Sequence, residues 1–160
     1  MSSADLATVL RWRNHPDVRR HMFDQHEIGA DEHRQWFERQ DPGRALLIYE
    51  ADNVPLGFAA LTRERNRLVA DWGFYAAPGA PKGTGRALGV LTLDYAFGSM
   101  ALHKVCGRAI ASNQRSIDLH LAVGFQREGL LREQHFDGQR HHAVVCFGLL
   151  AHEWLARSPA

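Results

Sequence analysis

The strongest constraint on this chain is a glycine-rich segment, Lys82-Gly83-Thr84-Gly85-Arg86-Ala87, that joins a strand-like stretch to a helix-like stretch. Residues 69–75 read as a strand, and apolar side chains recur after the segment at helical spacing. The first amides of a helix have no acceptor within the helix, and glycine lets an anion approach them closely. The segment therefore predicts a phosphate-binding loop. The alternative is a simple tight turn in which the glycines only satisfy backbone geometry.

Two common phosphate loops do not fit this segment. A dinucleotide fingerprint needs a third glycine where Leu88 stands, and a Walker loop needs Gly-Lys-Ser/Thr, which the sequence lacks. The phosphates must therefore belong to another ligand.

The remaining pattern predicts an α/β (α+β) fold in one domain over residues 1–160. Three helices are expected first: residues 5–13, a short helix that begins at Pro16 and carries Val18 and Met22, and a helix capped by Asp31. An antiparallel meander should follow at residues 45–50, 54–61 and 69–75. The C-terminal part should contain a strand at 104–111, a helix at 114–123 and two strands around the Asp137-Gly138 turn.

Composition excludes several classes of function. The chain of 160 residues is 45% apolar with a net charge of +1, so it lacks the basic excess of a nucleic-acid-binding domain. Its apolar runs fall far short of the ~20 residues of a membrane span, and no signal peptide precedes them, so we expect a cytoplasmic protein. Ten histidines are present, but they do not show metal-ligand spacing, so no metal is expected.

A second motif identifies a family. It reads Asn113-Gln114-Arg115-Ser116-Ile117-Asp118-Leu119-His120-Leu121-Ala122-Val123-Gly124-Phe125. With the glycine-rich loop it resembles the GNAT superfamily of acyl-CoA-dependent N-acetyltransferases, whose motifs are Gln/Arg-x-x-Gly-x-Gly/Ala and Asn-x-x-Ala/Ser-x-x-Leu-Tyr/His-x-x-x-Gly-Phe. Ala80 departs from the first position of the loop motif, which weakens one accessory contact.

Within that superfamily, further segments resemble the nucleotide-sugar N-acetyltransferases of pseudaminic acid biosynthesis, whose product decorates flagellins. The segments are Trp12-Arg13-Asn14, Met22-Phe23, His33 with Trp36-Phe37, Asp71-Trp72-Gly73-Phe74-Tyr75 and Gly148-Leu149-Leu150-Ala151-His152-Glu153-Trp154. The resemblance implies acetyl transfer from acetyl-CoA to the 4-amino group of UDP-4-amino-4,6-dideoxy-N-acetyl-β-L-altrosamine. Ribosomal-protein N-terminal acetyltransferases share two of these segments and are one alternative; a non-catalytic acyl-CoA-binding module is another.

The resemblance also implies a central mixed, mostly antiparallel sheet of six to seven strands that splays at the acetyl-CoA site. Only four residues precede the first expected helix, too few for the family's usual first strand, so six strands are favoured. The edge exposed by that loss could pair with a second subunit, giving a homodimer.

Site residues follow from the resemblance. Acetyl-CoA, the co-substrate, should contact Lys82, Gly83, Thr84, Gly85, Arg86, Ala87, Asn113 and Ser116. The nucleotide-sugar amine should contact Arg13, Met22, His33 and Tyr75. His120 takes the position of the family's tyrosine and is expected to donate a proton to the leaving thiolate; Tyr95 or Tyr75 could take this role instead. Asp71 is the candidate general base and would act through a water. For Asp71, an ordinary carboxylate at a strand edge is the competing interpretation.

Overall fold

A six-stranded sheet in the order β1-β2-β3-β4-β6-β5 forms the centre of the molecule. The computed structural model describes residues 1–39, 41–64 and 68–157. Its strands are β1 (Arg44–Ala51), β2 (Val54–Arg63), β3 (Val69–Ala76), β4 (Lys104–Ile110), β5 (Gln126–Phe136) and β6 (His141–Leu150). Its helices are η1 (Ser3–Asp5), α1 (Leu6–Asn14), α2 (Pro16–Arg19), α3 (Ala30–Glu38), α4 (Thr84–Asp94), η2 (Tyr95–Ser99), α5 (Gln114–Ala122) and α6 (Ala151–Leu155).

The sheet is mixed, as predicted. Strands β1, β2 and β3 form the expected antiparallel meander, and β4, β6 and β5 form a second antiparallel group. The tight turn between β1 and β2 places Asp52 and Asn53 at φ 52° and 59°, a conformation that Asp and Asn tolerate better than most residues. A single parallel pairing, β3 with β4, joins the two groups.

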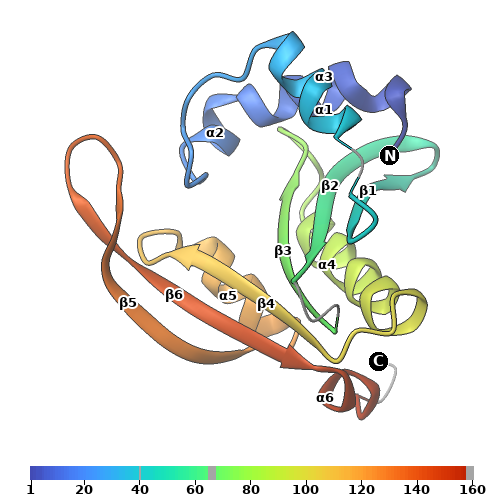
Figure 1. The fold of residues 1–160 in the computed structure, drawn as a ribbon, viewed down its shortest axis with the longest axis vertical. Helices are drawn as coiled ribbons and strands as arrows, with labels where there is room; N and C mark the ends of the chain where they lie inside the picture. Colours follow the sequence, from blue (N-terminus) through green and yellow to red (C-terminus); the bar gives the residue numbers. More distant parts are fainter. Residues whose placement is uncertain (40, 65–67, 158–160) are drawn as a thin grey trace.

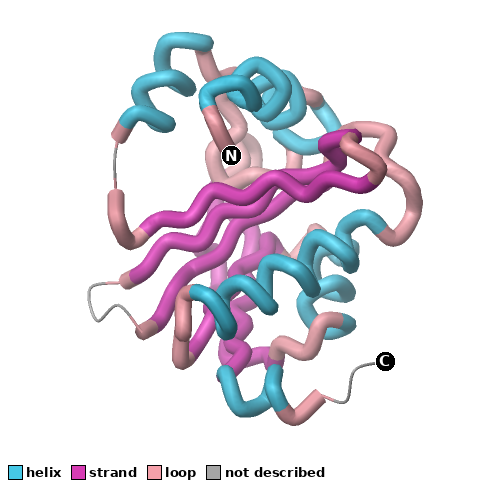
Figure 2. Tube along the Cα trace, turned by 90° about the vertical axis from the view of Figure 1, so that its right-hand side faces the viewer, coloured by secondary structure: helices cyan, strands magenta, loops and turns pink. Residues whose placement is uncertain are grey.

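Helices cover both faces of the sheet (Figures 1 and 2). Helices α1, α2 and α3 lie together on one face, and α4 and α5 lie on the other. The α4 face contains much of the core, where Trp72, Phe97, Phe125 and Phe147 are all buried. None of the described helices has the length and apolar character that crossing a bilayer requires.

The N-terminal residues contact the first strand of the sheet, β1. Residues Ser3–Asp5 form a short 3-10 turn, and the amino group of Met1 donates a hydrogen bond to the carbonyl of Leu46 in β1, at 3.0 Å. Within the described residues the sheet begins with β1 and has six strands, in agreement with the expected number.

Two helix boundaries differ from the prediction. Helix α2 ends at Arg19, so Met22 lies in the following loop rather than on the helix. Helix α4 ends at Asp94 and continues as a π-helical turn, η2, which contains Tyr95. Sequence periodicity does not distinguish these short changes of helix type because they depend on packing against other elements.

Candidate active site

The parallel strands β3 and β4 separate in the middle of the sheet. Their register contains only three pairs and ends where Asp71 faces Cys106, while β3 continues along β2 and β4 continues along β6. In Figure 1 the two strands diverge from this point. Beyond it, the backbone groups of each strand that face the other have no strand partner. Such groups need hydrogen bonds, so a ligand that carries amides can occupy the gap.

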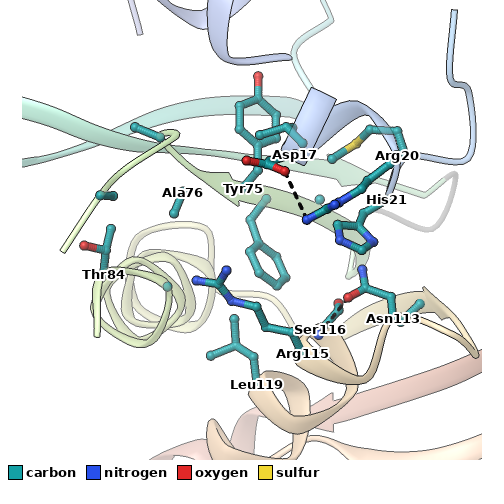
Figure 3. A pocket seen from close by; sticks show the side chains of 18 of the residues that line it. Asp17, Arg20, His21, Tyr75, Ala76, Thr84, Asn113, Arg115, Ser116 and Leu119 are labelled. Atoms are coloured by element: carbon teal, nitrogen blue, oxygen red, sulfur yellow. Dashed lines mark hydrogen bonds and ion pairs between the residues drawn. The ribbon is translucent and has the colours of Figure 1, made fainter. Parts of the chain in front are cut away.

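A cavity of about 610 Å³ lies at this gap. It extends from the loop after α2, across β3 and β4, to the first turns of α4 and α5, as Figure 3 shows from close by. The predicted site residues that line it are Met22, Asp71, Tyr75, Thr84, Gly85, Asn113, Ser116 and His120. The structure therefore brings together residues from every predicted group.

The glycine-rich loop has the geometry of an anion cradle. Gly83 caps α4 at φ +98°, a left-handed conformation that favours glycine, and no atom lies within 4 Å of where its Cβ would be. The amides of Arg86 and Ala87 donate to the carbonyl of Gly83 at 3.0 and 3.1 Å. Within the described residues, no backbone acceptor takes the amides of Lys82, Gly83 and Gly85. This loop fits a phosphate group through those free amides, whereas the amides of Arg86 and Ala87 are already used.

Helix α5 begins on the opposite side of the cavity. The side chain of Asn113 caps it, because Asn113 Oδ1 accepts a hydrogen bond from the amide of Ser116 at 3.2 Å. Between them, Arg115 reaches toward the start of α4 in Figure 3, and none of the described carboxylates forms an ion pair with it. Sequence reasoning did not select Arg115. A basic residue in the first turn of a ligand-facing helix is the signal that would have found it.

The structure corrects the role predicted for His120. The residue is only 1% exposed, and its ring stacks on Phe147 with centroids 4.5 Å apart. Its Nδ1 lies 2.7 Å from the carbonyl oxygen of Ser116, and its Nε2 accepts the indole N–H of Trp72 at 3.0 Å. A carbonyl only accepts and an indole N–H only donates, so the ring proton is on Nδ1 and both nitrogens are bonded. Burial also lowers the pKa of His120. No N–H is left to donate to a departing sulfur.

The other predicted acid–base residues separate into two groups. Asp71 lines the cavity with its side chain 44% exposed, and its Oδ2 lies 3.6 Å from Arg108 Nη2. Tyr75 also lines the cavity, and burial raises the pKa of its hydroxyl. Tyr95 follows the last residue of α4, about 16 Å along the helix from the phosphate loop at 1.5 Å per residue. The structure therefore does not bring Tyr95 to the cavity.

Two of the four predicted acceptor contacts, His33 and Arg13, are not among the residues that line the cavity. His33 is 5% exposed and stacks on Trp36 with centroids 5.1 Å apart, and its burial lowers its pKa, so it is a core histidine. Arg13 Nη2 donates to the carbonyl of Asp24 at 2.5 Å. Among the described residues, the neighbouring carboxylate of Asp17 pairs with Arg20 and not with Arg13.

The charges that line the cavity are mostly paired. Asp17 lies 3.1 Å from Arg20, the ion pair drawn in Figure 3, and Asp71 lies near Arg108. His21 stands beside these groups with its pKa lowered by burial and by Arg20 and Arg115. Among the described lining residues, the carboxylates each have an arginine partner, and Arg115 adds one unmatched positive charge.

Comparison with known proteins decides the family. Residues 1–126 match the acetyltransferase (GNAT) domain family. This chain is a GNAT acetyltransferase. The prophage-derived N-acetyltransferase YokL of Bacillus subtilis is 30% identical over 131 residues, which are 78% of this chain and 73% of YokL.

More distant relatives of this acetyltransferase include two other named acetyltransferases. The acetyltransferase PseH of Campylobacter jejuni is 24% identical over 75% of this chain and 76% of PseH. The spermidine N(1)-acetyltransferase of Vibrio cholerae is 25% identical over 99% of this chain and 94% of that protein. A structure of the Vibrio cholerae spermidine N-acetyltransferase with CoA and spermine has a TM-score of 0.90 at 23% identity, covering 97% of this chain and 95% of that one. That structure shows the same fold.

Acetyl-CoA is thus the co-substrate of this acetyltransferase, and an N-acetyl product follows from attack of an amine on the thioester. The N–C bond forms, the C–S bond breaks, and CoA leaves as a thiolate. Within the described residues, no group of three or more His, Cys, Asp or Glu side chains is placed to hold a metal ion.

Proposed function

We propose that this acetyltransferase acetylates the primary amine of a small, oxygen-rich and negatively charged acceptor, with a UDP-linked amino-deoxysugar such as UDP-4-amino-4,6-dideoxy-N-acetyl-β-L-altrosamine as its substrate. The observation that carries this proposal is the pairing of charges in the cavity. A polyamine carries several positive charges and needs unpaired carboxylates, but Asp17 and Asp71 already face Arg20 and Arg108. Arginine forks suit phosphate oxygens better than ammonium groups.

In this proposal the two halves of the cavity have different tasks. The free amides of the glycine-rich loop and the guanidinium of Arg115 hold the pyrophosphate of acetyl-CoA. The unpaired backbone of β3 and β4 takes the pantetheine arm and donates to the oxyanion. Trp72 packs toward α4, so strand alternation directs Asp71, Gly73 and Tyr75 to the opposite face, where the amine would arrive.

Asp71 is the base in this scheme, through a water, because its carboxylate is half-exposed at the point where the strands separate. Met22 and Tyr75 supply apolar surface for the acceptor. Arg20 lies at the rim, where its guanidinium, besides its contact with Asp17, would donate to a diphosphate.

The relative from Vibrio cholerae that spans nearly the whole chain favours a second candidate, a polyamine acceptor. The test is CoA release with a UDP-linked 4-amino sugar, the same sugar without UDP, spermidine and a peptide. We expect the highest kcat/KM with the nucleotide sugar. A higher value with spermidine or the peptide would replace the proposed acceptor class.

A matched pair of variants sharpens this test. Arg20→Gln should lower kcat/KM for the nucleotide sugar by about tenfold, and much less for the sugar without UDP, because a charged hydrogen bond contributes about 1.5–3 kcal/mol. Arg11→Gln, an exposed arginine of α1 outside the lining, is the control. Equal losses with both sugars would mean that Arg20 only supports the fold of the loop.

A further inference from the structure

Two buried side-chain nitrogen atoms of the described residues have no hydrogen-bond partner. They are Arg13 Nη1 on α1 and His135 Nε2 on β5. Although these residues are far apart in sequence, both adjoin the same short segment. Arg13 Nη2 donates to the carbonyl of Asp24, and the ring of His135 meets the ring of Phe23 edge-on, with centroids 5.5 Å apart.

His135 is the less expected of the two. It is 8% exposed on the long hairpin of β5 and β6, where most of β5 is exposed. The nearest histidine, His142, does not satisfy it, because His142 Nε2 is held by Asp137 at 2.5 Å and the two rings are 6.2 Å apart. A buried polar atom without a partner destabilises the folded state because its lost hydration is not replaced. Such an atom needs an explanation, and a ligand is one.

Phe23 connects this atom to the acceptor side of the cavity. Its side chain is 48% exposed and lines the cavity, while its ring contacts His135. A half-exposed aromatic ring changes rotamer easily, so Phe23 can leave the imidazole open to a molecule in the cavity.

We propose that Phe23 and Asp24 cover a polar subsite for the acceptor in which His135 Nε2 and Arg13 Nη1 are the hydrogen-bonding groups. The inference rests on the proposed function, because it assumes a small amine in this cavity. A guanidinium only donates, so the group at Arg13 must bring an oxygen acceptor; an imidazole can donate or accept and suits a hydroxyl. The subsite therefore selects a hydroxylated, oxygen-bearing amine. A polyamine, which has no oxygen, leaves Arg13 Nη1 unsatisfied.

The test compares His135→Phe with His141→Phe, an exposed histidine of the same hairpin. Melting temperature, Kd for acetyl-CoA, and kcat/KM for the amine panel are measured on each variant. Phenylalanine removes the unpartnered nitrogen and keeps a ring of similar shape, so we expect His135→Phe to melt no lower than wild type. We also expect its kcat/KM for the best oxygen-bearing amine to fall about fivefold to tenfold, with Kd for acetyl-CoA unchanged. His141→Phe should change none of these values.

A second variant distinguishes a lost hydrogen bond from a general disturbance of the fold. His135→Gln keeps a hydrogen-bonding side chain and should recover part of the lost kcat/KM, which a purely packing role would not produce. Unchanged kcat/KM in His135→Phe, or an equal loss in His141→Phe, would overturn the subsite. If wild type prefers spermidine, the proposed acceptor class fails. In that case His135 keeps a role in acceptor binding only if His135→Phe lowers kcat/KM for spermidine, and an unchanged value overturns the subsite as well.

Discussion

Replacing His120 with alanine separates a structural histidine from a catalytic one. The substitution removes an imidazole that is 1% exposed and stacked on Phe147, and it leaves the indole N–H of Trp72 buried without an acceptor. Truncating a large buried ring typically lowers the free energy of unfolding by about 3–5 kcal/mol. The unpartnered indole N–H that the truncation leaves contributes to this loss. In a domain of this size, each kcal/mol lowers Tm by about 2–4 °C. We therefore expect Tm to fall by about 6–20 °C.

The assay combines urea unfolding followed by tryptophan fluorescence with CoA release measured well below the Tm. Turnover per folded molecule should stay within about threefold of wild type, because no N–H of His120 is available to the thiolate. The opposite pattern would refute this reasoning. Unchanged Tm with a loss of kcat of tenfold to a thousandfold, in the range typical of a general acid, would return His120 to catalysis.

A glycine on the neighbouring strand tests the same contact without removing the imidazole. A Cβ at Gly107 would lie 2.7 Å from Trp72 Nε1 and would also collide with His120, so Gly107→Ala should separate the pair and lower Tm by several degrees. Gly73 in β3 has nothing within 4 Å of its Cβ position, so Gly73→Ala should leave Tm unchanged. Equal Tm values for the two variants would mean that the Trp72–His120 contact does not stabilise the packing of α5 against β3.

Three further predictions address the phosphate loop, Tyr95 and the loop before α3. Acetyl-CoA should raise the Tm of wild type and of Gly83→Ala but not of Gly83→Glu. Both variants carry the backbone strain of φ +98°, and only glutamate adds a negative charge that repels the pyrophosphate. An equal rise in the Tm of Gly83→Glu would exclude the loop as the pyrophosphate site. Tyr95→Phe should leave kcat within about twofold of wild type in the CoA-release assay, because Tyr95 lies beyond the far end of α4; a tenfold loss would contradict its placement. Hydrogen bonds to Asp24 and then Glu32 raise the pKa of His26, and the bond to His26 lowers the pKa of Asp24. The contacts therefore stabilise the loop above about pH 4, where Asp24 would be ionised in the unfolded chain, and this stabilisation is lost as pH rises past about 6.5 and His26 loses its proton. Thermal unfolding of His26→Gln should therefore differ from wild type most between these limits, and a difference that grows at alkaline pH would be inconsistent with the contact.

Much of the fold follows from local signals in the sequence. The turn at Asp52 and Asn53, the glycine that caps α4 and the Asn113 cap of α5 each depend on residues close in sequence, and each lies at a boundary of the predicted strands and helices. The end of α2 at Arg19, before Met22, and the π-helical turn after α4 were missed because they depend on packing against distant elements. The six strands of the sheet agree with the lower of the two strand numbers that were expected.

The candidate site was predictable only where backbone conformation defines it. The glycine-rich loop needs no distant contact to present its amides, so the sequence could locate it. The role of His120 on α5 depends on Trp72, which is 48 residues earlier and on strand β3, so no motif could show that both ring nitrogens are bonded. The role predicted for His33 was also not met. Its stacking partner Trp36 is close in sequence, but the burial of His33 depends on how the N-terminal helices pack together, which the sequence pattern does not show. Arg115 and His135 were missed because their surroundings come from separate elements.

The bonded state of His120 has a consequence for how acetyl transfer is catalysed. A thiol has a pKa of about 8.5 by analogy with cysteine, so CoA can leave as a thiolate near neutral pH without a protein acid. An alkylammonium has a pKa of about 10.4, so the acceptor must lose a proton before it can attack. The more demanding proton transfer is therefore on the acceptor side, where Asp71 lies half-exposed beside Arg108. Alignment of the amine with the thioester in the gap between β3 and β4 can then supply the larger part of the rate, because it converts a two-body reaction into one between held partners.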